Sequence, residues 1–185
     1  MKAFKISLLS LFAIALLSCK KETADLSSTI HYVSFHIKGE NPAVVQVGEV
    51  YTDAGVLATL QGKDVTSTIT IESNVDHEAM GMYKVEYTAV NADGLKSRAI
   101  RDVIVCNPNV TEDLSGRYTT QTGTERLTLA SGALIPYPGY HATITRLAPG
   151  FFSINDFLGG YYAERVYPQY GYTVMGMTGH FALNE

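Results

Sequence analysis

The chain has 185 residues, of which 46% are hydrophobic, and its formal net charge is −4. Affinity for a nucleic-acid backbone needs clustered Lys and Arg, so this acidic composition excludes a nucleic-acid-binding protein. A chain of this length is expected to form one domain or two small ones.

The N-terminal segment has the pattern of a signal peptide. Lys2 and Lys5 lead into an apolar run, Ile6–Leu17, which is shorter than the ~20 residues of a membrane-spanning helix. Its end, Leu16-Leu17-Ser18-Cys19, resembles the lipobox of bacterial lipoproteins. The resemblance implies that residues 1–18 are a lipoprotein signal peptide and that a diacylglycerol on the Cys19 thiol anchors the chain to a membrane. An ordinary secretory signal with a chance cysteine is the alternative.

Processing at Cys19 would change both the thiol count and the charge. Cys106 would be the only free thiol, so neither an intrachain disulfide nor a cysteine-based zinc site is expected. Loss of two lysines with the signal peptide would take the net charge to −6. The polar residues that follow have no apolar period, so residues 19–30 are expected to form a lipidated tether.

Residues 31–106 have the period-two pattern of a β-sandwich. In Met82–Ala89, apolar side chains alternate with polar ones, which indicates a half-buried strand. The turn Asn91–Gly94 joins it to the next strand, so the pair should form a hairpin. No helix is expected in this region. The expected strands are Val33–Ile37, Ala43–Val47, Val56–Leu60, Thr68–Glu72, Met82–Ala89 and Ser97–Val105.

Several motifs in this region occur together in one family. They are Val47-Gly48, Tyr51-Thr52-Asp53-Ala54-Gly55, Asp64-Val65-Thr66 with Ile69, Gly81–Ala89, and Asp93-Gly94. In order and spacing they resemble the Ig-like repeats of bacterial surface proteins, which also occur in some insecticidal crystal proteins. The resemblance implies a spacer, adhesion or ligand-presenting module rather than a catalyst.

A domain boundary is predicted at Asn107–Thr111. Pro108 cannot donate to a sheet ladder and disfavours helix at the preceding residue, so the last strand should stop before it. Residues 107–113 are therefore interpreted as a linker and residues 114–185 as a second domain. Its expected strands are Gly116–Gln121, Glu125–Ala130, His141–Arg146 and Phe151–Asn155, with turns between them and no long regular element in the Gly- and Tyr-rich stretch 159–172.

Two motifs of the second domain, Leu114–Tyr118 and Asp156–Tyr162, resemble the uncharacterised C-terminal β-domain that follows an Ig-like repeat in lipoproteins of gut Bacteroidetes. That family implies no particular activity. Phe181 and Leu183 begin a strand pattern that no partner strand follows, so we expect the domain to be incomplete at its C-terminus. The predicted fold class is all-β, an Ig-like β-sandwich followed by a second small antiparallel β-domain.

The sequence contains no motif of a catalytic or metal site. Neither Gly-x-Ser-x-Gly nor His-Glu-x-x-His occurs, and the five histidines are scattered singly. Acidic residues such as Asp53 and Asp64 are interpreted as solvated loop charges rather than calcium ligands. No catalytic residue, metal or cofactor is expected, although Asp156 and Glu164 could be posed as a glycosidase pair.

A tyrosine cluster near the C-terminus is the candidate binding site. Sugars present apolar C–H faces and many hydroxyls, so aromatic rings flanked by polar side chains suit them. The alternative is that these tyrosines fill a thin β-core. The candidate ligand-binding residues are Asn155, Asp156, Tyr161, Tyr162, Arg165, Tyr167, Tyr170 and Tyr172.

These observations predict an outer-membrane-anchored lipoprotein that acts as a non-catalytic binding or presentation module. Its expected partners are the membrane, through the lipid on Cys19, and a glycan or a surface protein, with the cell surface favoured over the periplasm. An adhesion or structural protein that binds another surface protein is the alternative, and a glycoside hydrolase comes third.

Overall fold

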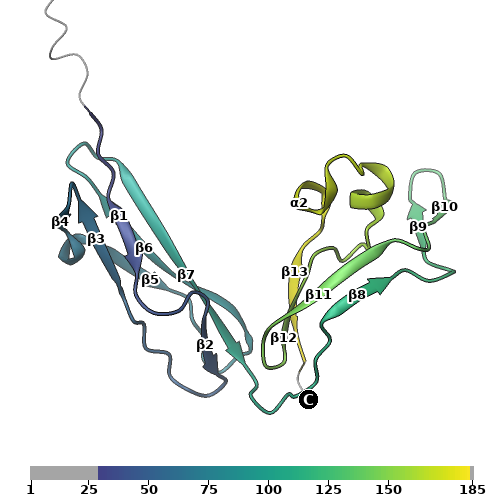
Figure 1. The fold of residues 1–185 in the computed structure, drawn as a ribbon, viewed down its shortest axis with the longest axis horizontal. Helices are drawn as coiled ribbons and strands as arrows, with labels where there is room; N and C mark the ends of the chain where they lie inside the picture. The colour runs from purple at the N-terminus through teal and green to yellow at the C-terminus, as the bar shows by residue number, and fades with distance from the viewer. Residues whose placement is uncertain (1–28, 184–185) are drawn as a thin grey trace, which may run out of the picture. The chain divides into compact units, whose positions relative to one another are not determined.

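The computed structural model describes residues 29–183, which form a nearly all-β fold with a few short helices (Figure 1). The predicted fold class is confirmed. The signal peptide, Cys19 and the tether up to residue 28 lie outside the described residues. The first half of the described chain contains β1 (Ser34–Ile37), β2 (Ala43–Gln46), β3 (Val56–Leu60), β4 (Lys63–Asp64), the 3-10 helix η1 (Thr66–Thr68), β5 (Thr70–Ser73), β6 (Gly81–Val90) and β7 (Lys96–Cys106).

These strands form the two sheets of an Ig-like sandwich. One sheet has the order β1-β3-β4 and the other β2-β7-β6-β5. The chain changes sheets between β1 and β2, and β2 pairs with β7 in parallel, whereas the other pairs are antiparallel. The predicted hairpin is β6–β7, and the Asn91 side chain closes its turn by accepting hydrogen bonds from the backbone N–H groups of Asp93 and Leu95.

The core of the sandwich contains the apolar face predicted for β6. Val85 and Tyr87 are buried there against Val56 and Val103. Since side chains alternate between the two faces of a strand, this face follows directly from the period-two pattern. At the end of β7, Cys106 is buried with Ile104 as a small apolar group, and burial raises the pKa of its thiol.

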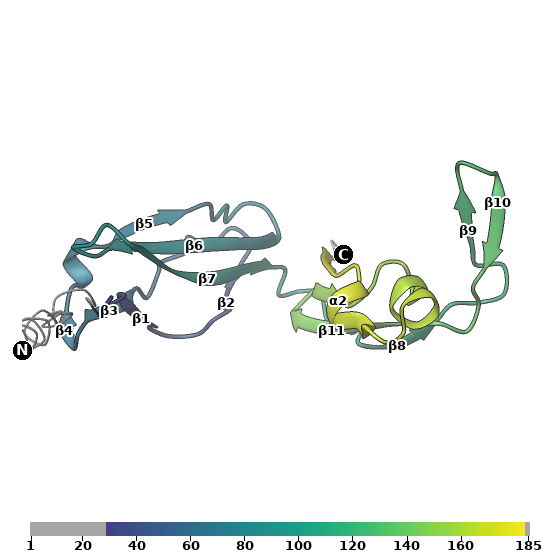
Figure 2. The same ribbon diagram turned by 90° about the horizontal axis from the view of Figure 1, so that it is seen from above.

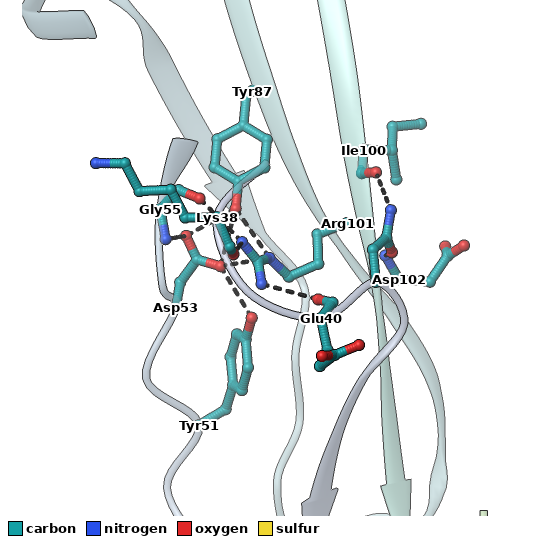
Figure 3. A network of polar contacts seen from close by, with 10 residues as sticks. Lys38, Glu40, Tyr51, Asp53, Gly55, Tyr87, Ile100, Arg101 and Asp102 are labelled. Carbon is teal, nitrogen blue, oxygen red and sulfur yellow. Dashed lines mark hydrogen bonds and ion pairs between the residues drawn. The ribbon is translucent and has the colours of Figure 1, made fainter. Parts of the chain in front are cut away.

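A buried polar network lies inside the sandwich and departs from the sequence interpretation of Asp53 (Figure 3). The Asp53 carboxylate is not a solvated loop charge, because it forms an ion pair at 3.0 Å with Arg101, whose side chain is 2% exposed. The hydroxyls of Tyr51 and Tyr87 also donate to Asp53, at 2.9 and 2.7 Å. Burial and the nearby carboxylate raise the pKa of Tyr51, so it stays a neutral donor.

The Arg101 guanidinium ties separate segments of the sandwich together. Its Nη1 donates to the backbone carbonyl of Glu40 at 3.0 Å, and its Nη2 donates to the carbonyls of Lys38 and Gly55 (Figure 3). Burial by itself would lower the pKa of Arg101, but the contacts with Tyr87 and Asp53 outweigh it and raise that pKa. A buried charge is tolerated here because its donors are satisfied.

The second half contains a four-stranded antiparallel sheet, order β13-β12-β11-β8, and two short helices (Figure 1). The β9–β10 hairpin is separate from this sheet (Figure 2). Its elements are β8 (Gly116–Thr119), β9 (Glu125–Thr128), β10 (Ala133–Pro136), β11 (His141–Ala148), β12 (Phe151–Ile154), the π-helix η2 (Tyr161–Val166), α2 (Gly171–Met175) and β13 (Gly179–Ala182).

Three features of this half differ from the sequence predictions. Strand β10 was not predicted and pairs with β9. The stretch 159–172 breaks the sheet but contributes to two short helices. The terminal strand β13 does have a partner, since it pairs with the earlier strand β12, and Phe181 stacks on Phe152 with ring centroids 5.4 Å apart. The partner was missed because it precedes β13 in the chain.

Candidate functional site

Five tyrosine rings of the second half lie in series and form what we call the tyrosine row. Its members in spatial order are Tyr137, Tyr161, Tyr162, Tyr167 and Tyr170. The first two contacts are edge-to-face, each with centroids 4.9 Å apart. The next two are longer, at 6.4 and 6.3 Å. These spacings are those of favourable aromatic pairs, so the rings support one another in one continuous series of contacts.

The π-helical turn η2 creates the centre of this row. The backbone N–H of Tyr167 donates to the carbonyl of Tyr162 at 2.9 Å, which closes a π-helical turn from residue i to residue i+5. The two rings consequently stack, with an interplanar angle of 13°. Gly160 precedes the turn with a left-handed φ of 85°, and a Cβ there would lie 2.8 Å from the carbonyl oxygen of His141. Only glycine fits this position without strain.

A small pocket opens at the buried end of the row. Its lining residues are Arg126, Tyr137, Leu158, Tyr161 and Tyr162, and its volume is about 180 Å³. Drug-sized ligands usually occupy roughly 300 Å³ or more. The pocket therefore suits a single ring-sized group, with the rest of a longer ligand lying outside it.

Two arginines flank the Tyr161 ring. The guanidinium carbons of Arg126 and Arg165 lie 5.4 and 5.7 Å from its centroid, within the range of a cation–π contact. Arg165 also donates from Nη1 to the carbonyl of Pro136 at 2.7 Å. These contacts attach the β9–β10 hairpin to η2 and add positive charge to the pocket.

The predicted site residues divide between surface and core. Tyr167 and Tyr170 are 41% and 53% exposed, and Tyr162 is half-buried. Tyr161, in contrast, is 6% exposed and packs edge-to-face against Tyr137 and Tyr162. The core alternative therefore describes Tyr161, whereas Tyr167 and Tyr170 are exposed and open to a ligand.

Asn155 and Asp156 hold the backbone rather than face the pocket. Asp156 is 1% exposed, and its carboxylate accepts hydrogen bonds from the N–H groups of Leu158, Gly160 and Met177. The side-chain oxygen of Asn155 accepts from the N–H of Thr143 at 2.6 Å. These groups fix the loop that precedes η2, and neither belongs to the pocket lining.

Tyr172 belongs to a polar cluster with Glu164 and His141 rather than to the tyrosine row. Its hydroxyl lies 2.6 Å from Glu164 Oε1 and 2.6 Å from the carbonyl of His141, and His141 Nδ1 lies 3.0 Å from Glu164 Oε2. Burial by itself would raise the pKa of Glu164, but hydrogen bonds from Tyr172 and His141 lower it below its ordinary value. Burial and the carboxylate raise the pKa of Tyr172. This cluster joins η2 to α2 and β11.

Other parts of the described chain are weaker candidates for a ligand site. A larger hollow of about 340 Å³ lies beside β2, but Tyr51 and Arg101 in its lining are already committed to the buried network. Between residues 29 and 183, no three His, Cys, Asp or Glu side chains gather as a metal site. No helix in this same range has the length and apolar character needed to cross a membrane.

Sequence reasoning missed three residues of the pocket. Arg126, Tyr137 and Leu158 lie outside the predicted cluster. Arg126 comes from β9, and Tyr137 directly follows the unpredicted strand β10. No local pattern links the hairpin to η2, so only the fold brings them together.

Comparisons with known proteins identify the two halves. Residues 35–105 match a family described as bacterial surface protein, Ig-like domain, and residues 107–185 match a second family described as a C-terminal domain. None of the curated proteins searched matches the chain.

The crystal structure of the lipoprotein BT2262 from Bacteroides thetaiotaomicron is 32% identical, with a TM-score of 0.46, over 83% of this chain and 74% of that one. Two fragments of Clostridium perfringens ZmpB, one solved with GlcNAc, are 18% and 20% identical, with TM-scores of 0.34 and 0.33. Each covers 66% of this chain, which spans 29% and 14% of theirs, and neither supports a conclusion about a ligand. The identity to the lipoprotein and the two family matches show that the chain belongs to a family of bacterial cell-envelope proteins in which a surface Ig-like domain precedes this C-terminal domain.

Proposed function

We propose that the protein is a membrane-anchored, non-catalytic binding module whose second domain binds a glycan on the tyrosine row. The observation that carries the proposal is the series of rings that runs from the pocket at Tyr161 to the exposed Tyr170. In the corresponding domain arrangement, residues 31–106 are the Ig-like module, 107–113 the linker and 114–185 the binding domain.

The chemistry of the row suits a sugar chain. Flat rings accept the C–H faces of pyranoses, and tyrosine hydroxyls at the ring edges can hydrogen-bond sugar hydroxyls. The pocket of about 180 Å³ would take one sugar, while neighbouring sugars would lie over Tyr167 and Tyr170. The contacts of Asp156 and Glu164 argue against the glycoside hydrolase alternative. The Asp156 carboxylate accepts hydrogen bonds from backbone N–H groups, and Glu164 is engaged with His141 and Tyr172.

The test is affinity electrophoresis of the soluble chain 19–185, with Cys19→Ala, through gels that contain different polysaccharides. We expect at least one polysaccharide to slow migration. Tyr170→Ala and Tyr162→Ala should each weaken that binding about tenfold, because a stacked ring contributes a kcal/mol or two. Tyr118→Ala is the matched control, since Tyr118 is similarly exposed but lies outside the row.

Unchanged binding in the row variants, or equal loss in Tyr118→Ala, would contradict the assignment. Thermal unfolding of each variant accompanies the binding data. Tyr170→Ala should unfold at nearly the wild-type temperature because its ring is half exposed.

The membrane anchor is the second part of the proposal, and its support is the lipobox at Leu16–Cys19. Metabolic labelling with a fatty acid should mark the wild-type chain and leave Cys19→Ala unlabelled and released from membranes. A labelled Cys19→Ala variant would disprove the anchor. Protease shaving of intact cells tests whether the chain faces outward from the outer membrane.

A protein partner is the second candidate function, favoured by the β9–β10 hairpin. Leu127 and Leu134 are cross-strand partners and both are exposed, as is Leu129 beyond β9. If a surface protein binds this hairpin, a photo-crosslinker at Leu129 should give one discrete protein adduct on intact cells. The same crosslinker at exposed Val50 in the first half should give none.

A further inference from the structure

We infer that the tyrosine-row pocket selects a sugar that carries a carboxylate, with Arg126 as its main anion-binding residue and Arg165 beside it. The inference rests on the proposed glycan-binding function and names the class of sugar. It comes from the ion-pair and hydrogen-bond partners of these two arginines among the described residues rather than from the rings.

Among the described residues, Arg126 in the pocket lining and Arg165 beside the Tyr161 ring have no acidic partner, unlike three of the other four arginines there. Arg98, Arg101 and Arg117 each pair with a carboxylate. Within residues 29–183, neither Arg126 nor Arg165 forms an ion pair. Two unneutralised cations beside one ring are unusual on a chain whose net charge is −4.

Most of the Arg126 guanidinium is available to a ligand. In the described part of the chain, its one hydrogen bond is from Nη1 to the Thr128 hydroxyl at 3.2 Å. A guanidinium has five N–H donors in a planar fork that matches the two oxygens of a carboxylate. Because Arg126 lines the pocket with Tyr137, Tyr161 and Tyr162, a sugar held on the rings would place a ring substituent near this fork.

The acidic side chains nearby do not cancel this charge. Glu125 precedes Arg126 on β9, and alternation along the strand places the two side chains on opposite faces of the hairpin. Glu164 on η2 is engaged with His141, Tyr172 and Arg117. A protein with a negative net charge repels an acidic polysaccharide. Binding of such a polymer therefore needs arginines at the site itself.

The test compares one polymer in two charge states. Homogalacturonan is presented to the soluble chain 19–185 (Cys19→Ala) either de-esterified, with free carboxylates, or methyl-esterified, with neutral ones. We expect the de-esterified form to bind at least tenfold more tightly. Arg126→Gln should reduce that binding about tenfold and Arg165→Gln by less, because Arg165 already donates to Pro136.

Arg98→Gln is the matched control, because it removes the same charge from an exposed pair in the first half. Equal weakening by Arg98→Gln, or equally tight binding of dextran sulfate, would show non-specific attraction and overturn the inference. If Arg126→Gln is destabilised in thermal unfolding, Arg126→Lys serves in its place. It keeps the charge but loses the fork, so intermediate binding is expected.

Failure of this inference is distinguishable from failure of the proposed function. If both forms of homogalacturonan bind equally, or only neutral polysaccharides bind, carboxylate selection is wrong and glycan binding stands. If neither the homogalacturonan pair nor any neutral polysaccharide slows the chain, the glycan-binding function is wrong and the inference fails with it.

Discussion

Arg101 illustrates how one residue can stabilise the sandwich while carrying a buried charge. Its guanidinium reaches Asp53, the Tyr87 hydroxyl and three backbone carbonyls, so its removal would leave several buried acceptors without donors. Breaking a buried ion pair from one side is far more costly than breaking an exposed one, because the remaining charge stays desolvated.

Arg101→Met should therefore lower the free energy of unfolding by about 3 to 5 kcal/mol. Arg98→Met, which breaks the more exposed pair with Glu86, should cost about 1 kcal/mol or less. Urea unfolding of both variants at neutral pH measures the difference. Similar losses in the two variants would contradict the role assigned to the buried network.

Glu164 gives a pH-dependent prediction. Its folded-state pKa is lowered from an ordinary value of 4.5, so its contribution to stability is present above that pH and is lost as pH falls through the folded pKa. The destabilisation caused by Glu164→Gln should therefore be full at pH 7 and shrink below about pH 4.5. Tyr172→Phe, which removes one hydrogen bond to Glu164, should reduce the same acid dependence in part. A Glu164→Gln effect that is constant from pH 7 to pH 3 would refute this assignment.

At the scale of elements, the join between η2 and β11 depends on one glycine. Gly160→Ala would combine a left-handed φ with a Cβ 2.8 Å from a backbone oxygen, so it should cost about 2 kcal/mol or more. Gly171→Ala also has a positive φ, 59°, but its Cβ would meet nothing within 4 Å, so about 1 kcal/mol is expected. Thermal or urea unfolding compares the two, and equal losses would contradict the close approach.

The elements also explain which parts of the fold were predictable. The β6–β7 hairpin was predictable, because the alternation of apolar and polar residues and the Asn91–Gly94 turn are local signals. The pairing of β13 with β12 was not, because it joins segments distant in the chain. The stretch 159–172 was expected to hold no long regular element, whereas Gly160 in it directly precedes the π-helix η2.

The candidate site was predictable to a similar degree. The density of tyrosines in the sequence was enough to propose the tyrosines of η2, and those that follow η2, as ligand-binding residues. It could not separate the buried Tyr161 from the exposed Tyr170, nor supply Arg126 and Tyr137 from the β9–β10 hairpin. It also placed Asp156 at the ligand, whereas this carboxylate accepts backbone N–H groups instead.

At the scale of the whole molecule, the proposed linker 107–113 gives the next prediction. Most of its residues are exposed, although Val110 is buried. Limited proteolysis should cut within 107–113 or before residue 31 ahead of any cut in the sheets of either half, because exposed linkers are cleaved most readily. Mass spectrometry of the fragments locates the cuts. Resistance of this segment, with one cooperative unfolding transition, would instead indicate a single fused unit.

The proposed function depends on where a glycan binds. The most direct measurement is nitration of the tyrosines of the soluble chain, with and without the polysaccharide that slows the chain in affinity electrophoresis. Mass spectrometry quantifies the nitration of each peptide. We expect the ligand to slow nitration of Tyr162, Tyr167 and Tyr170. Nitration of Tyr32 and Tyr118 should be unchanged, although both are exposed. Protection of Tyr32 or Tyr118 with continued nitration of Tyr167 and Tyr170 would contradict it.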